Sequence, residues 1–418
     1  MSDFSTTLAW FKPCEDLEQI DPAPAVTAPP SVVFEESGSI KVMEGVTRVT
    51  VSGGRRLRVE QSVELPSYAN QATVFLNGWQ ARYEGSDHHL FDVAVIFRSI
   101  RVTPGQAIEW STTGDLADKQ GEAAFTLTYR FGIIAWNDAA VRAMVDHNDA
   151  EHFCRTGEPH GSDNFFKGEN DGAPDATTTS LSSFSSFLRN PGFATGRQVA
   201  VLPRGFVFAG PGDGGGDDHH LLQLAYNLES VAPVVRNQNY HKADGMLNPL
   251  DGEAADVVNG EFVSWKTSVI MKDNSLRDDY SFAEFVSAMG GPDVEILQPE
   301  FAVLPREDVD ANIVGGGLPA RLQTANIVVA NLPYAYAVPI LTGWDMGYTP
   351  PGEGDQHIKE LGVFIDQLRY ERPPGSAAGT LSYTVSSIVK DKDSFPENYF
   401  RHKVTILGLK PIVASSPG

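Results

Sequence analysis

The stretch Phe75–Val102, FLNGWQARYEGSDHHLFDVAVIFRSIRV, decides how the rest of the chain is interpreted, because two later stretches follow the same plan. These are Val201–Val231, VLPRGFVFAGPGDGGGDDHHLLQLAYNLESV, and Ile340–Tyr370, ILTGWDMGYTPPGEGDQHIKELGVFIDQLRY. Each has a glycine followed by an aromatic residue, then an acidic or glycine-rich loop, then Asp-x-His and an alternating apolar run. A pattern that recurs in the same order indicates an internal repeat. The sequence therefore predicts three related β units.

The repeated positions give this prediction its detail. The three glycines lie 127 and 138 residues apart, and the shared positions are Gly78, Trp79 and His89, then Gly205, Phe206 and His220, then Gly343, Trp344 and His357. A further strand-like segment follows in each copy, at Phe125–Asp138, Phe262–Ser275 and Leu381–Ser394. Glycine–aromatic hairpins that recur through composition alone are the alternative explanation.

The alternation of side chains predicts which way the repeated histidines point. Successive side chains of a strand lie on opposite faces of its sheet. The histidine of each copy shares a face with mostly apolar residues, so this face is expected to point into the core. The opposite face is half polar and is expected to be solvated, with Asp92 and Arg98 in the first copy, Gln223 and Asn227 in the second and Glu360 and Asp366 in the third. The aromatic residues after the glycines are expected in the core rather than on a sugar-stacking surface.

Short polar stretches and helical signals complete the organisation. The chain has 418 residues, which we divide into a tail with a Pro/Ala-rich linker (1–30) and β units at 31–160, 161–310 and 311–418. Asp138–Val145 and Ser281–Met289 are expected to form short helices, the second with a capping box from Ser281 to Glu284. The predicted fold is mainly β, with three tandem related sandwich or jelly-roll-like units and few short helices.

The charge of the chain excludes two classes of partner. Asp and Glu number 54 against 32 Lys and Arg, a net charge of −22, whereas nucleic acid and anionic membranes require a basic surface. The longest apolar region, Ala325–Leu341, is interrupted by Asn and Pro and is no membrane helix. No signal peptide is visible at the N-terminus, so we expect a cytoplasmic, particle-borne or non-classically exported protein.

Few residues offer recognisable chemistry. The loops that precede the repeated histidines contain the polar residues that we take as the candidate binding site, namely Asp87, His88, Asp217, Asp218, His219, Asp355 and Gln356. Their acidic oxygens suit Ca²⁺, but glycine and aspartate are also ordinary hairpin residues, so no cofactor is predicted and calcium stays an alternative. The cluster Asp146–His160 offers His147, His152 and Cys154 to zinc, at a spacing of five between the histidines that suits one helix face poorly.

The absence of catalytic signatures favours a protein without enzymatic activity. The chain contains no GxSxG, HExxH or Walker A sequence, and Gly210-x-Gly212-x-x-Gly215 is surrounded by aspartates that would repel a pyrophosphate. We expect either a multivalent binder of carbohydrate or cell surfaces, or a subunit of an oligomeric assembly such as a virion or tail-like particle. Its expected partners are copies of itself or surface glycans. The alternative is a metal-dependent enzyme that uses the Asp-x-His loops or the Asp146–His160 cluster.

Overall fold

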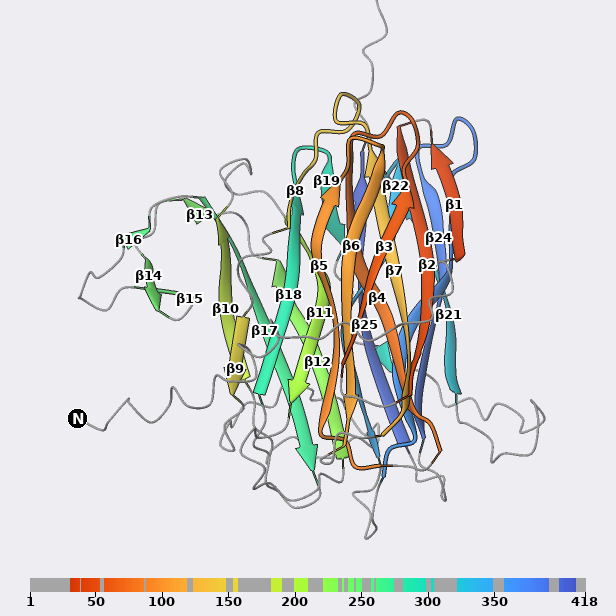
Figure 1. The fold of residues 1–418 in the computed structure, drawn as a ribbon. Coiled ribbons are helices and arrows are strands. Elements are labelled where there is room, and N and C mark those ends of the chain that lie inside the picture. The colour runs from red at the N-terminus through yellow and green to blue at the C-terminus, as the bar shows by residue number, and fades with distance from the viewer. Residues whose placement is uncertain are drawn as a thin grey trace, which may run out of the picture.

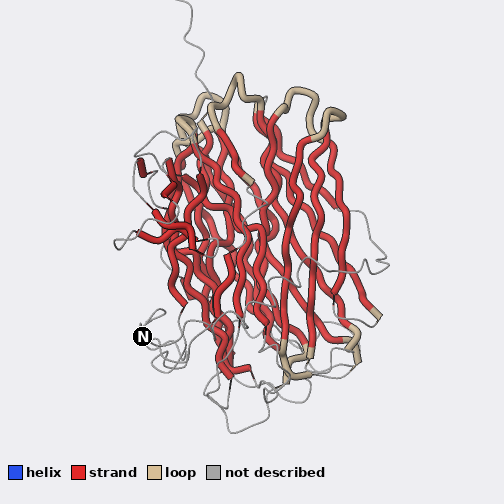
Figure 2. The backbone as a smooth tube through the Cα atoms, turned by 60° about the vertical axis from the view of Figure 1, so that its left-hand side comes forward, coloured by secondary structure: helices blue, strands red, loops and turns tan. Residues whose placement is uncertain are grey.

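The computed structural model forms three large antiparallel β-sheets, which we call sheets A, B and C, and one small sheet (Figure 1). Their long strands lie along nearly the same axis of the molecule, and neighbouring strands are antiparallel (Figure 2). The structure describes residues 31–37, 39–52, 56–85, 88–118, 123–147, 153–156, 182–189, 199–209, 221–231, 235–236, 240–243, 246–249, 257–258, 261–273, 281–297, 302–303, 322–348, 357–390 and 398–410. The fold is thus mainly β, as predicted, and no helix occurs within these ranges.

Sheet A joins strands from the two ends of the chain. Across the sheet its strands are β1 (Ser31–Ser37), β2 (Ile40–Val51), β7 (Phe125–Trp136), β4 (Gln71–Tyr83), β23 (Glu360–Glu371), β24 (Gly379–Lys390) and β21 (Leu322–Leu332). The two halves meet where β4 pairs with β23, with Trp79 opposite Val363.

Sheet B joins the first and middle parts of the chain. Its order is β3 (Arg56–Glu64), β6 (Ala107–Ala117), β5 (Asp92–Val102), β11 (Val199–Ala209), β18 (Ser281–Gly290) and β8 (Met144–Asp146), with β9 (Phe153–Thr156) also paired to β18. The two parts meet where β5 pairs with β11, and Phe206 lies opposite Val95.

Sheet C joins the middle and last parts of the chain. Its order is β10 (Ser182–Arg189), β17 (Glu261–Asp273), β12 (Leu221–Val231), β22 (Tyr336–Tyr348), β25 (Asn398–Leu409) and β19 (Val294–Leu297), with β13 (Val235–Arg236) on β17 and β20 (Ala302–Val303) on β25. The small sheet contains β15 (Met246–Pro249), β14 (Tyr240–Ala243) and β16 (Val257–Val258). Each large sheet therefore combines strands from two of the predicted units, and the structure does not show three separate sandwiches.

The inner faces of the three sheets meet in one aromatic core. Trp79 of sheet A, Phe206 of sheet B and Trp344 of sheet C contact one another pairwise, with ring centroids 5.1 to 5.5 Å apart. All three side chains are buried. The expectation that these aromatic residues belong to the core is confirmed.

The glycine before each aromatic residue lies at an irregularity in its strand. The register shifts between Leu76 and Gly78 in β4, between Pro203 and Gly205 in β11 and between Leu341 and Gly343 in β22. Gly78 and Gly205 both have a φ of 151°, and a Cβ at Gly205 would lie 2.0 Å from the Val95 carbonyl oxygen. Only glycine fits this conformation and this close approach of two backbones.

Two predicted helices are strands or turns instead. Ser281–Met289 belongs to β18, and Asp138–Val145 forms turns and the start of β8. Glu284 does not cap a helix but is fully buried, where it accepts hydrogen bonds from Tyr226 and Thr267. Strand β18 is buried on both faces, and the sequence of such a strand lacks the alternation that separates strands from helices.

The face expected to be solvated is largely buried. The side chains of Asp92, Gln223, Asn227 and Glu360 are 1 to 9 % exposed. They are polar because they bond within the sheets: Gln80 donates to Glu360 at 2.5 Å and Gln223 donates to Asp345 at 3.1 Å. Arg98 and Asp366 are half-buried. The sequence shows that a side chain is polar, but polarity alone does not distinguish solvent from a hydrogen-bonding neighbour.

The segments predicted to follow the repeated strands are not equivalent to one another. The first, Phe125–Asp138, contains β7, which pairs with β4. The other two contain most of β17 and β24, which pair with β12 and β23, the strands that carry the apolar runs. Two long strands follow the apolar run in each case, and the sequence pattern did not separate the first from the second.

Candidate functional site

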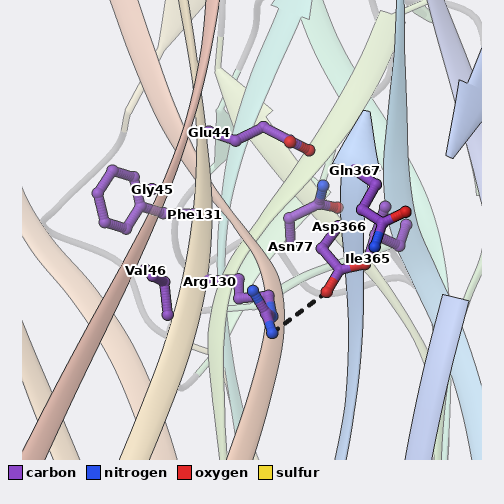
Figure 3. A pocket seen from close by; sticks show the side chains of 9 residues that line it. All are labelled: Glu44, Gly45, Val46, Asn77, Arg130, Phe131, Ile365, Asp366 and Gln367. Carbon is purple, nitrogen blue, oxygen red and sulfur yellow. Dashed lines mark ion pairs between the residues drawn. The ribbon is translucent and has the colours of Figure 1, made fainter. Parts of the chain in front are cut away.

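A small pocket opens at the irregular point of sheet A (Figure 3). It has a volume of about 120 Å³. Strands β2, β4, β7 and β23 supply its lining, which consists of Glu44, Gly45, Val46, Asn77, Arg130, Phe131, Ile365, Asp366 and Gln367. Gly45 leaves room for the Phe131 ring, since a Cβ there would lie 2.1 Å from the ring.

An ion pair crosses this pocket. Arg130 Nη2 lies 3.3 Å from Asp366 Oδ2, and its guanidinium group lies 4.1 Å from the centre of the Phe364 ring. Burial lowers the pKa of Arg130, and Asp366 acts against this shift. Burial also raises the pKa of Asp366, against the opposing effect of Arg130. The two charges therefore compensate each other in a partly desolvated position.

Backbone contacts occupy two further polar groups of the pocket. The Leu368 N–H donates to Glu44 Oε2 at 3.2 Å, and the Leu341 N–H of sheet C donates to Asn77 Oδ1 at 3.1 Å. Gln367 has a φ of 54°, and the register of β23 shifts between Asp366 and Arg369. These contacts give the polar groups structural roles. The described residues that line the pocket include no serine, cysteine or histidine, and its two carboxylates contact Arg130 (Asp366) and the Leu368 N–H (Glu44).

Two of the repeated histidines come together at one end of the sheets. The rings of His89 and His357 lie 4.3 Å apart, although 268 residues separate them in the sequence. Both side chains are half-buried. His88 pairs in a β-bridge with Ile358, so the two chain segments also meet through their backbones. The third repeated histidine, His220, lies outside the described residues.

The surroundings of this histidine pair are polar and hydrogen-bonded. His88 Nδ1 lies 2.8 Å from Asp118 Oδ2. Lys359, which is buried, donates from Nζ to the carbonyl oxygens of Tyr83 and Gly85 at 2.6 and 2.7 Å. Burial raises the pKa of Tyr83 well above 10, and the nearby acidic residues raise it further. The two hydrogen bonds from Lys359 hold the backbone at Tyr83 and Gly85, which precede the histidines in the chain.

Most of the predicted binding residues lie outside the part of the chain that the structure describes. Asp87, Asp217, Asp218, His219, Asp355 and Gln356 lie outside the described residues, and so do His152, His160 and most of the proposed calcium loops. His88 is described and bonds to Asp118. His147 Nδ1 lies 3.1 Å from Ser287 Oγ. Within the described ranges, no group of three or more His, Cys, Asp or Glu side chains is arranged to hold a metal ion.

Sequence reasoning missed the buried and half-buried charged residues of the strands. Arg130, Glu284, Asp345 and Arg401 lie in long strands and none was singled out as a site residue. Asp345 is fully buried and accepts from Gln223, with Arg401 3.9 Å away. One signal was available: each of Arg130 and Glu284 is the only charged residue in its strand.

Comparisons with known proteins add no identity. The chain matches no model of a protein family, no curated protein and no solved structure. None of the described residues belong to a helix long and apolar enough to cross a membrane.

Proposed function

We propose that this chain is a non-enzymatic protein of three related β units, and that it serves as a structural subunit in an assembly of its own copies. The observation that carries the proposal is the meeting of Trp79, Phe206 and Trp344, one from each repeated segment, in one core. A body with three related sides can repeat one contact in several directions, which suits a scaffold.

Strand pairing supports the relation between the units. In each unit the first and fourth strands pair in one sheet, and the second and third pair in the next. The units are β4–β7, the set β11, β12, β17 and β18, and β22–β25. Where two units meet, the residues opposite the glycines on the neighbouring unit are Phe364, Ile96 and Asn227. Each lies seven residues after a repeated histidine, namely His357, His89 and His220 in that order.

Aromatic burial favours the structural version over carbohydrate binding. Sugar recognition commonly uses exposed aromatic rings. The large apolar side chains that are exposed among the described residues are Val102, Met144, Leu297 and Val328, with no aromatic residue among them. The pocket in sheet A also favours a structural role, because Asp366 pairs with Arg130 and Glu44 accepts a backbone N–H, so both carboxylates have structural partners.

The mass of the purified full-length chain in solution tests this function. We expect light scattering after size exclusion to give a multiple of 45.3 kDa, and electron microscopy to show particles of regular shape. A monomer at every concentration, together with binding on a glycan array, would overturn the structural role and favour the multivalent binder.

A metal-dependent activity is the second candidate, favoured by the approach of His89 and His357. Two imidazoles from distant segments are a partial ligand set for a transition metal. Metal analysis should then find a stoichiometric metal that is lost in both His89→Ala and His357→Ala but retained in His147→Ala. Protein without metal after incubation with Zn²⁺ would rule this candidate out.

A further inference from the structure

Strand β21 ends sheet A on the side beyond β24, and the structure shows no other described strand paired to it. Its residues alternate in exposure: Asn326, Val328 and Ala330 are exposed, with Val328 at 67 %. Ile327 and Val329 are half-buried and pack against the core. The strand is thus anchored on one face and open on the other.

The strand differs from the other sheet ends in charge. Leu322–Leu332 contains no charged residue, although 21 % of the chain is charged and its 11 residues would on average contain about two. The other strands that end the main strand order of the large sheets are β1, β19, β3, β8 and β10, and each contains at least one charged residue. Beside β19, the uncharged β20 is only two residues long.

Strand β3 shows how an edge of this protein is protected. Arg58, Glu60 and Glu64 occupy exposed positions along it, and Arg58 pairs with Glu60 at 3.0 Å. Charged side chains on an edge strand oppose pairing with another chain. An edge of 11 residues without such protection is a site where a further strand can add.

A second copy of this chain fits the edge for two reasons. A net charge of −22 makes two copies repel each other, so contact is favoured where charge is absent. The strand is also self-complementary. Antiparallel pairing centred on Asn326 places Val328 opposite Thr324 and Ile327 opposite Ala325, with no charged pair in the interval.

The geometry of β21 sets the extent of this pairing. Its register with β24 is regular from Leu322 to Val329 and then shifts, and Asn331 has a φ of 61°. Pairing centred on Asn326 can use Gln323–Val329, which lies within the regular part of the strand. Residues directly opposite in an antiparallel pair lie on the same face, so the half-buried side chains of both copies remain on the core side.

We propose that two copies of this chain associate through β21, whose strands pair antiparallel about Asn326 so that sheet A continues from one copy into the other. This inference rests on the proposed function, since it names the contact by which copies assemble. It predicts that association depends on one strand and on one register.

Sedimentation velocity of the full chain over a range of concentrations tests the contact. The variant Val328→Lys places a charge on the exposed face, and we expect the association constant to fall at least about tenfold. The matched control is Ser62→Lys, at an exposed position of the protected edge β3, which should associate like the wild type. Circular dichroism verifies that both variants fold.

Cysteine cross-linking tests the register and does not depend on the lysine variant. In a background with Cys14→Ser and Cys154→Ser, the Asn326→Cys variant has its new thiol opposite the same position of the second copy and should form a disulfide-linked dimer on oxidation. The Ala330→Cys variant has its thiol opposite Leu322 and should not. Oligomers that resist Val328→Lys and lack the cross-link in Asn326→Cys overturn the β21 contact and leave the proposed function standing. A wild-type monomer at all concentrations overturns both.

Discussion

The glycine–aromatic positions of sheets A and C have the same strand arrangement but different buried neighbours. In sheet A, Trp79 lies opposite Tyr129, whose hydroxyl donates to Gln61 at 3.0 Å. In sheet C, Trp344 lies opposite His402, whose Nδ1 is buried with no hydrogen-bond partner within the described ranges. The two sheets therefore share a backbone arrangement but differ in the side chains at this position. The Tyr129 hydroxyl has a hydrogen-bond partner, whereas His402 Nδ1 has none within the described ranges.

Sheet B presents a third variant of the same position. Phe206 lies opposite Glu284, which accepts from Thr267 at 2.7 Å and Tyr226 at 3.2 Å. The residue opposite each glycine, on the last long strand of the same unit, varies as well. Arg130 lies opposite Gly78 and Lys403 lies opposite Gly343, whereas Phe285 lies opposite Gly205 and belongs to a small apolar cluster. The residue that follows the glycine is aromatic in all three sheets.

The largest expected effect breaks what the sheets share. Trp344→Ala removes a ring that contacts Trp79, Phe206 and Phe208, and should lower the free energy of unfolding by about 3–5 kcal/mol. Urea unfolding measures this loss. Val102→Ala, at a position that is 37 % exposed, is the control and should change it by less than about 0.5 kcal/mol. A loss below about 1 kcal/mol for Trp344→Ala would show that the three rings do not form the core.

A second change tests the shared backbone. Gly205→Ala introduces a Cβ against the Val95 carbonyl at a φ of 151°, and should destabilise the fold by about 3 kcal/mol. Gly375→Ala is the control, since Gly375 also has a positive φ, of 77°, but nothing lies within 4 Å of the added Cβ, and it should cost only about 1 kcal/mol. Thermal unfolding of both variants gives the difference. Equal losses would contradict the close approach of β11 and β5.

A third change isolates the unsatisfied position in sheet C. Burial lowers the pKa of His402 to about 4 from 6.5, so the unfolded chain binds a proton in this range that the folded chain does not. Stability from this group is complete above pH 6.5 and decreases as the pH falls toward 4, by an amount on the order of 3 kcal/mol. His402→Gln should lose this part of the acid dependence in urea unfolding at several pH values. An unchanged pH profile would contradict the burial of the imidazole.

The smallest effect is expected on the outer side of sheet A. Asp366→Asn removes the ion pair with Arg130, but both side chains are 26 % exposed and the loss should be at most about 1 kcal/mol. The same variant should also leave any oligomeric assembly intact, because β21 does not include this position. A loss above about 2 kcal/mol in urea unfolding would mean that the pair is buried in the assembled protein.

The repeated segments show how far the sequence reached. Alternation placed Val93, Val95 and Phe97 on one face of a strand, and all three are buried in the core. The spacing between Gly78, the aromatic residue and the histidine predicted an internal repeat, and the strand pairing is consistent with that repeat. The Ser281–Met289 helix was wrong, because a strand buried on both faces shows no alternation.

The candidate site was less accessible to sequence reasoning. Arg130 and Asp366 are 236 residues apart, and only the pairing of β4 with both β7 and β23 brings them together. His89 and His357 were predicted to occupy similar places in separate units, and not to contact each other. Pattern in one segment carries no information on which other segment will lie beside it.

The sequence by itself determined that the chain is mainly β and that the aromatic residues after the repeated glycines are buried. These are local properties, set by backbone sterics and by alternation along one strand. Only the tertiary structure decided that each unit divides its strands between two sheets, because strand partners are chosen by packing across the whole molecule. That choice joined three aromatic rings in one core, buried a polar face that was expected to be solvated, and left β21 as an uncharged edge.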